Sequence, residues 1–138
     1  MLLQRSPCHI RTFMTIAQEQ CDELAKKFPG TTCVLSPDGS YLITVPDVIL
    51  PEGWTPRKTT VRFVAPVGFP ASKPDCFWAD LNLKLDGGRN PQNTGQTPLP
   101  YGPNPLLWFS WHVQRWSPNS DSLTTYFRVI ENRFHELR

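Results

Sequence analysis

A serine and a histidine lie two residues apart in the most aromatic stretch of the sequence, PLLWFSWHVQRWSP, residues 105–118. They are Ser110 and His112. A serine hydroxyl attacks an acyl group only with help, usually from a neighbouring base that accepts its proton. In extended backbone, residues i and i+2 point to the same side, so His112 can reach Ser110 or stabilise the charge that develops there. The pair therefore predicts acyl-transfer chemistry.

The same stretch also has a purely structural interpretation. It holds three of the five tryptophans, Trp108, Trp111 and Trp116, and aromatic residues this dense usually belong to a core. In that case Ser110 is a small residue at a tight packing point and His112 is a hydrogen-bonded structural histidine. An aromatic cluster can also dock a partner protein. Both alternatives stay open at the level of sequence.

Cys76 is a second candidate nucleophile, because a thiolate is a better acyl acceptor at neutral pH than a hydroxyl. It stands at the entry to a predicted core strand. The other cysteines are Cys8, Cys21 and Cys33, and no pair has the CxxC spacing of a zinc ribbon or a thioredoxin-like motif. We expect reduced thiols that pack as small hydrophobic groups, with no disulfide scaffold and no metal site.

Two helices frame the elements that must position these residues. Thr15 predicts the cap of a helix over 15–28, with Gln18 as its capping-box partner. The predicted face of this helix is Ile16, Gln20, Leu24 and Phe28, with Ala17, Cys21 and Ala25 beside it. Asn119 or Ser120 is expected to cap a second helix over 121–137. Its apolar stripe at helical spacing is Leu123, Phe127, Ile130, Phe134 and Leu137.

Four strands are predicted between the helices, with short turns that favour an antiparallel meander. The turn Ser36-Pro37-Asp38-Gly39 separates the first two, and Pro46 indicates an edge or a bulge in the second. Residues 86–105 are rich in Gly, Pro, Asn and Gln and are predicted to be a long loop. The expected fold class is α+β, with helices on one face of an antiparallel sheet. The predicted strands are 31–35, 41–50, 59–65 and 76–85.

Composition limits the class of protein. The chain has 138 residues, 39% hydrophobic and 19% charged, which suits one globular domain. The net charge of +2 is too small to indicate nucleic-acid binding, and the basic residues form no run that would attract a membrane surface. No apolar run has the ~20 residues of a membrane span. Residues 1–13 do not resemble a signal peptide and are expected to be a disordered extension, with one domain over 14–138.

The order of these elements, together with two motifs, resembles the ubiquitin-conjugating (UBC-like) fold. Phe69-Pro70 followed by Pro74 is similar to the aromatic-Pro-x-x-x-Pro signature of that family. Trp116-Ser117-Pro118 before the last helix is similar to the Trp-Ser-Pro that follows its active-site loop. The segment SWHVQRWSPNSDSLTTYF most resembles prokaryotic family E of conjugating enzymes. The resemblance covers about residues 15–138.

The resemblance implies a cytoplasmic bacterial enzyme that carries a ubiquitin-like protein as an acyl intermediate and transfers it to an acceptor. Implied partners are the ubiquitin-like protein and an activating enzyme that uses ATP, with a JAB-type peptidase as a pathway neighbour and antiphage defence as a plausible role. No cofactor or metal is implied for this chain. The catalytic residues it suggests are Ser110, His112 and Asp121, the last as an acidic residue near the gate for the attacking lysine. A simple helix N-terminal charge is the alternative for Asp121.

One departure from the family pattern decides which chemistry is expected. The family keeps a catalytic cysteine shortly before Trp-Ser-Pro, whereas residues 108–115 contain no cysteine and one hydroxyl, that of Ser110. The His-Pro-Asn motif is also absent, and Asn90-Pro91-Gln92-Asn93 echoes it in part. Asn90 or Asn93 can stabilise an oxyanion or serve the turn. We therefore expect an oxyester on Ser110, or else an inactive scaffold that binds a ubiquitin-like protein or its activating enzyme. If the fold prediction fails, a generic α+β interaction domain remains.

Overall fold

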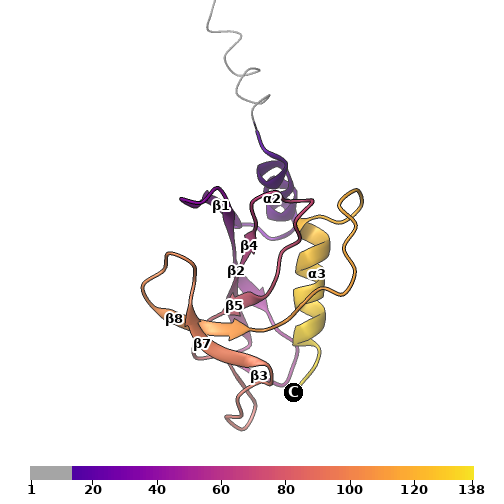
Figure 1. Cartoon of the computed structure of the whole chain (residues 1–138). Helices are drawn as coiled ribbons and strands as arrows, with labels where there is room; N and C mark the ends of the chain where they lie inside the picture. The colour runs from indigo at the N-terminus through magenta and orange to yellow at the C-terminus, as the bar shows by residue number, and fades with distance from the viewer. Residues whose placement is uncertain (1–13) are drawn as a thin grey trace, which may run out of the picture.

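The computed structural model of the chain describes residues 14–138, and the predicted disordered extension 1–13 lies outside them (Figure 1). The described part has two helices, α2 (Ile16–Lys27) and α3 (Leu123–Phe134), and eight strands. None of its helices has the length and apolar composition of a membrane span. The strands are β1 (Thr32–Leu35), β2 (Tyr41–Ile49), β3 (Trp54–Thr55), β4 (Lys58–Ala65), β5 (Phe77–Ala79), β6 (Lys84–Leu85), β7 (Thr94–Pro98) and β8 (Pro105–Phe109).

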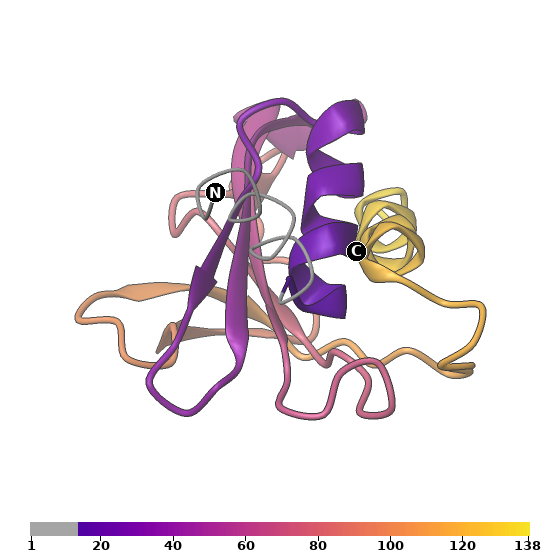
Figure 2. The same ribbon diagram turned by 90° about the horizontal axis from the view of Figure 1, so that it is seen from above.

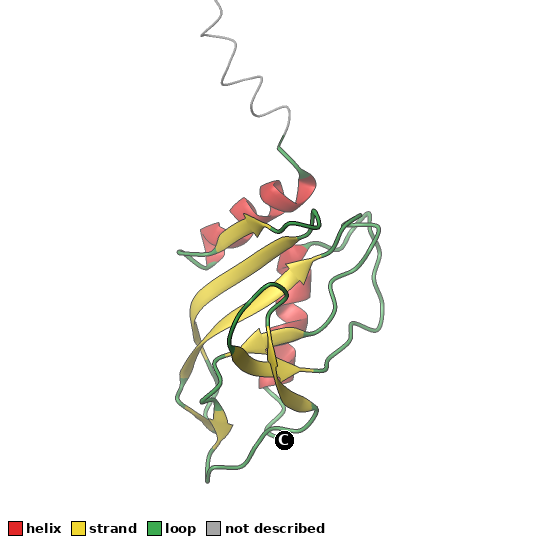
Figure 3. Ribbon diagram, turned by 60° about the vertical axis from the view of Figure 1, so that its left-hand side comes forward, coloured by secondary structure: helices red, strands yellow, loops and turns green. Residues whose placement is uncertain are grey.

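Six strands form one antiparallel sheet in the order β1-β2-β4-β5-β8-β7, and β3 pairs with β6 in a separate two-stranded sheet. Both helices cover the same face of the large sheet (Figures 2 and 3). The α+β class and the one-sided packing of the helices are confirmed. The predicted four-strand meander was too short, because β8 and β7 extend the sheet beyond β5.

The core lies between the sheet and the helices. Along β4 buried residues alternate with more exposed ones, as expected for a strand with one face on the core. Trp54 donates its indole N–H to the Phe134 carbonyl at 2.7 Å, which satisfies the polar atom of a ring that is 1% exposed. Phe109 stacks on Phe77 with ring centroids 4.5 Å apart. These contacts tie β8 and the end of α3 to one aromatic core.

Helix α2 begins where the sequence predicts. Thr15 caps it, and the capping box with Gln18 is present. Its buried residues, Ala17, Cys21 and Leu24, all belong to the predicted apolar face and the positions beside it. Ile16 is the exception, because its side chain is 50% exposed.

Helix α3 begins later than predicted. Its cap is Ser122, which forms a capping box with Thr125, so neither Asn119 nor Ser120 caps it. The predicted stripe is buried from Leu123 to Phe134, with Tyr126 added. Leu137 is wrong as a core residue, because the helix ends at Phe134 and the Leu137 side chain is 48% exposed.

The predicted strand 76–85 is divided in two. Asp80 interrupts it because its carboxylate accepts hydrogen bonds from the Thr60 N–H and the Arg62 guanidinium, which fixes it beside β4. A turn follows, with the Leu83 N–H bonded to the Asp80 carbonyl. Only then does the chain form β6. The predicted loop 86–105 is likewise interrupted, by β7.

The turn and the bulge are confirmed. Gly39 has a φ of +94°, which a residue without a Cβ adopts freely. The register of β2 against β4 shifts between Val45 and Val48, as the bulge predicted at Pro46 requires.

Candidate functional site

The segment that carries Ser110 and His112 leaves the sheet directly after β8. β8 pairs with β5 on one side and β7 on the other, with Phe109 opposite both Phe77 and Thr94. The pairing continues beyond the strand ends. The Ser110 N–H donates to the Asn93 carbonyl at 2.8 Å, and the Cys76 N–H donates to the Trp111 carbonyl at 3.0 Å. The site segment is therefore fixed on both sides at its start.

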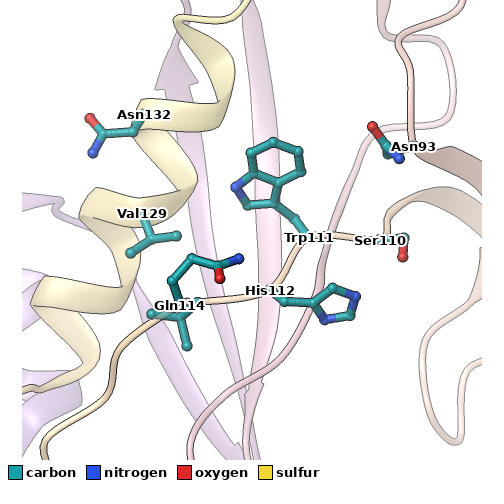
Figure 4. Close-up of a pocket in the computed structure, with 8 residues that line it drawn as sticks. Asn93, Ser110, Trp111, His112, Gln114, Val129 and Asn132 are labelled. Atoms are coloured by element: carbon teal, nitrogen blue, oxygen red, sulfur yellow. The ribbon is translucent and has the colours of Figure 1, made fainter.

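An open groove lies along this segment (Figure 4). It encloses about 480 Å³. Ser110 is half-buried in its wall and His112 is exposed. In Figure 4 the Trp111 ring extends toward α3, while the Ser110 hydroxyl and the His112 ring lie on the other side of the chain, as the i, i+2 argument predicts. The lining residues are Asn93, Ser110, Trp111, His112, Val113, Gln114, Val129 and Asn132.

The hydrogen-bond partner of His112 within residues 14–138 is Asp75, not Ser110. The ring Nδ1 lies 2.6 Å from Asp75 Oδ1. Both side chains are more than half exposed, at 57% and 53%. A carboxylate on one ring nitrogen fixes the tautomer and leaves the other nitrogen free to accept a proton. The direct Ser110–His112 contact that the sequence suggested is not formed in this conformation.

Cys76 lies beside this pair. Its sulfur, a His112 ring nitrogen and an Asp75 carboxylate oxygen all lie within 4.8 Å of one another. The residue is 8% exposed and has a φ of +62°, a strained conformation for a residue with a Cβ. Burial raises the pKa of the Cys76 thiol, and the Asp75 charge adds to this, while hydrogen bonds with Trp111 and Trp108 oppose it. The thiol is therefore protonated at neutral pH.

Arg133 packs against two aromatic rings, those of Phe109 and Trp111. This residue of α3 is 1% exposed. Its guanidinium lies 5.1 Å from the centre of the Trp111 ring and 5.3 Å from that of Phe109. It also donates to the Gln92 carbonyl at 2.9 Å. Burial lowers the pKa of the Arg133 guanidinium, but a group with so high an ordinary pKa stays charged. Cation–π contacts thus hold Trp111 in place.

The two stretches that resemble the conjugating-enzyme signature meet in space. Trp116 donates its indole N–H to the Pro70 carbonyl at 2.7 Å. Its ring lies 6.0 Å from that of Phe69. The two motifs are 46 residues apart in sequence, and their contact explains why the chain carries both an aromatic-Pro pair and a tryptophan at these positions. It fixes the chain downstream of the groove.

The remaining candidate residues are placed as follows. Asp121 lies in the loop before α3, not in its first turn, and accepts a hydrogen bond from the Ser117 N–H at 2.7 Å. Asn93 lines the groove and has a φ of +61°, which asparagine tolerates better than most residues. Asn90 accepts a hydrogen bond from Lys84 instead. Neither Asp121 nor Asn90 lines the groove that contains Ser110.

Asp75 is the functional-site residue that the sequence reasoning did not select. It lies 37 residues from His112, and no local pattern marks it. Its contact with His112 follows from the register of β5 against β8, with Phe77 opposite Phe109, and no signal in the sequence defines that register.

Comparison with known protein families gives one match. The model of prokaryotic E2 family E matches residues 29–136. This range includes both motifs, the groove and most of the sheet. No curated protein and no solved structure matches the chain.

Proposed function

Because the chain belongs to prokaryotic E2 family E, and because this family suggests a role in ubiquitin-like conjugation, we propose that it is a conjugating transferase with an acyl-carrying Ser110. One observation carries the choice of residue. Ser110 is half-buried in the wall of an open groove, in the segment between β8 and Trp116-Ser117-Pro118. A hydroxyl in such a wall is accessible to an extended peptide terminus and partly shielded from water.

The proposed reaction is an acyl exchange. The Ser110 oxygen attacks the carbonyl carbon at the activated C-terminus of a ubiquitin-like protein. The new bond joins Oγ to this carbon, the bond to the activating enzyme breaks, and the leaving group departs with its electron pair. The serine proton passes to a base. An acceptor nucleophile, such as a lysine amine, then attacks the oxyester and releases Ser110.

His112 is the proposed base. Its Nδ1 is held by Asp75 at 2.6 Å, so the free ring nitrogen is Nε2. A base oriented by a carboxylate is the general arrangement for activating a hydroxyl nucleophile. A change in the His112 side-chain torsions must bring Nε2 to Ser110, and exposure of more than half of the ring leaves room for it. Such contacts often tighten only when substrate is bound.

Asp121 has a lesser place in the proposal. One of its oxygens holds the Ser117 N–H, which secures the turn after Trp116. Its second oxygen remains for an incoming ammonium group. Asn93, on the groove wall, is the proposed amide donor to an oxyanion.

The proposed partners are a ubiquitin-like protein and an activating enzyme, with a JAB-type peptidase as a pathway neighbour. The proposed setting is antiphage defence in the bacterial cytoplasm.

The test is formation of a covalent adduct. The full chain is incubated with an activating enzyme, ATP and a ubiquitin-like protein. We expect an adduct that resists thiol reductant, is cleaved by hydroxylamine, and is lost in Ser110→Ala. Ser120→Ala, a serine outside the groove, is the matched control and should retain the adduct. An adduct that persists in Ser110→Ala refutes the assignment, and one lost in Cys76→Ser and by reductant moves the carrier to Cys76.

A non-catalytic scaffold is the second candidate function. The specific observation for it is that His112 is engaged by Asp75 while no cysteine occupies residues 108–115. Such a chain would bind the ubiquitin-like protein or its activating enzyme without accepting the acyl group. Binding measured by calorimetry, together with no adduct under conditions in which the activating enzyme is charged, selects this alternative.

A further inference from the structure

Three side chains of metal-ligating types meet at His112, which is the member of the three that lines the groove. They are Asp75, Cys76 and His112, and one potential ligand atom from each lies within 4.8 Å of the other two. They offer a carboxylate oxygen, a sulfur and an imidazole nitrogen. This mixed set suits a borderline-soft divalent cation such as Zn²⁺, which binds these three groups at ~2.0–2.3 Å. A divalent ion that prefers oxygen ligands alone does not select this set.

The backbone brings the ligands together before any metal arrives. Cys76 directly precedes β5 and His112 follows β8, and these two strands are antiparallel neighbours. The Cys76 N–H donates to the Trp111 carbonyl at 3.0 Å. The buried hydroxyl of Tyr126 donates to the Cys76 carbonyl at 2.7 Å. The two ligand-bearing segments are therefore fixed by three elements, β5, β8 and α3. Preorganisation of this kind lowers the entropic cost of binding an ion.

The conformation of Cys76 is the second observation. Its φ of +62° is costly for a residue with a Cβ, by ~1–3 kcal/mol. In this conformation the sulfur lies beside Asp75 and His112, although the residue is mostly buried. A cysteine that served only as a hydrophobic filler would gain nothing from proximity to a carboxylate.

Charge favours a cation over a free nucleophile at this position. A thiolate formed next to the Asp75 carboxylate has a like charge beside it, and a divalent cation bound between the two groups offsets that repulsion. The nearby ammonium of Lys73 donates to the Val113 carbonyl at 3.2 Å and forms no ion pair with Asp75 among residues 14–138. A divalent ion neutralises one thiolate and one carboxylate together and deprotonates a coordinating thiol.

We propose that Asp75, Cys76 and His112 form a binding site for a zinc-class divalent cation, with a fourth coordination position open to water on the exposed side of Asp75 and His112. The cation takes the place of the proton between His112 and Asp75, the neutral imidazole then carries its one proton on Nε2, and the Cys76 proton is released to solvent. Both exposed ligands can separate slightly to admit it. The expectation of no metal site rested on the lack of CxxC spacing, whereas these ligands come from two segments of the chain.

This proposal goes beyond acyl transfer and does not depend on it. A zinc site can exist in a conjugating enzyme or in a scaffold, but a zinc-bound His112 carries a proton on Nε2, so only the metal-free chain uses His112 as the proposed base. Three protein ligands and one open position are typical of zinc sites that bind an exogenous group, whereas structural sites are closed by four protein ligands. The ligand class expected at the open position is water or an anionic oxygen.

The experiment uses the full chain, stripped of metal by a chelator and then dialysed. Zn²⁺ is titrated in competition with a chromophoric indicator, and Co²⁺ is added separately as a spectroscopic probe. We expect one Zn²⁺ per chain and, with Co²⁺, a thiolate-to-metal charge-transfer band with intense visible bands of tetrahedral type. Cys76→Ser should abolish the charge-transfer band. Loss of a group that merely orients a ligand costs about 10–100-fold in affinity, so His112→Gln and Asp75→Asn should each cost at least about 100-fold.

Three controls address other thiols and imidazoles. Cys33→Ser changes a thiol on β1, and His135→Gln changes an imidazole at the end of α3. Cys8→Ser tests a cysteine outside the described residues. Each control should leave affinity and spectrum unchanged. Far-UV circular dichroism of the metal-free variants shows whether they fold, and His112→Gln is informative on its own because that side chain is mostly exposed.

The outcomes are distinct. Retention of the thiolate band in Cys76→Ser, its loss in Cys8→Ser or Cys33→Ser, or affinity unchanged in His112→Gln overturns the proposed site. No stoichiometric Zn²⁺ or Co²⁺ binding by the folded wild type also overturns it. None of these readouts requires a ubiquitin-like protein, so failure here leaves the adduct result unaffected, and the reverse also holds.

Discussion

Tyr126→Phe removes one hydroxyl from the interface between α3 and the site. The side chain is 1% exposed, and its hydroxyl donates to the Cys76 carbonyl at 2.7 Å. Phenylalanine keeps the ring, so its packing against Phe63, at a centroid distance of 5.3 Å, is retained. The substitution therefore isolates a single buried hydrogen bond between the last helix and the residue that precedes β5.

The expected cost follows from the carbonyl that is left behind. A buried acceptor that loses its partner costs about 1–3 kcal/mol, more than the net value of an average hydrogen bond. Cys76 is 8% exposed, so water replaces the lost donor poorly. We expect a loss of about 2 kcal/mol in the free energy of unfolding, relative to the wild type.

Urea unfolding followed by tryptophan fluorescence measures this loss. For a small domain the slope m is about 1–3 kcal/mol/M, so a loss of about 2 kcal/mol lowers the midpoint by about 1 M at unchanged m. Tyr41→Phe is the matched control. Tyr41 is half-buried in β2, and its hydroxyl has no hydrogen-bond partner within residues 14–138. It should change stability by less than about 0.5 kcal/mol.

Equal midpoints for Tyr126→Phe and Tyr41→Phe would refute the reasoning. They would mean that the Cys76 carbonyl finds another donor at no cost. A fall in m with no shift of midpoint would instead place the effect in the unfolded state.

Three further predictions concern local features. Ser122→Ala removes the cap of α3 and should cost ~1 kcal/mol in urea unfolding, whereas Ser120→Ala should be nearly neutral; the reverse order would contradict the observed helix start. Hydrogen bonds from Ser40 lower the pKa of Asp38 in the folded chain below its ordinary value of 3.8. The ionised Asp38 therefore stabilises the folded state at a pH above 3.8, and this contribution is lost as the pH falls through the lower pKa of the folded chain. The difference in urea midpoint between wild type and Asp38→Asn should therefore disappear in strong acid, and a constant difference from neutral pH to strong acid would be incompatible with this. Burial raises the pKa of Cys33 to about 12, so at pH ~8 its alkylation by iodoacetamide, followed by mass spectrometry, should be more than tenfold slower in the folded chain than in urea; equal rates would contradict the burial argument.

Local signals predicted the first helix and its cap, because Thr15 and Gln18 satisfy each other's backbone N–H groups within one turn. The start of α3 could not be found in this way. Several residues before it can act as caps, and the choice involves α2, since Gln20 accepts a hydrogen bond from the Leu123 N–H at 2.8 Å. That contact spans 103 residues and leaves no local pattern.

The strands show the same division between local and distant causes. β4 was predicted because its alternation reports one buried face. β7 was missed because Thr94–Pro98 is polar and includes Gly and Pro, and its strand conformation comes from pairing with β8. At the site, local spacing predicted that Ser110 and His112 share one side of the chain. The contact between His112 and Asp75 depends on sheet register, which the sequence alone did not define.

The position of β8 inside the sheet also limits how a partner chain can enter. Its backbone N–H and C=O groups are used by β5 on one side and β7 on the other, and the Trp111 carbonyl beyond it is taken by Cys76. An incoming peptide tail cannot add as a new strand beside Ser110. If an extended tail binds in the groove, as the proposed function requires, its recognition would rely on side chains such as Trp111, His112 and Gln114, and its specificity would depend on tail side chains and not on strand addition beside β8.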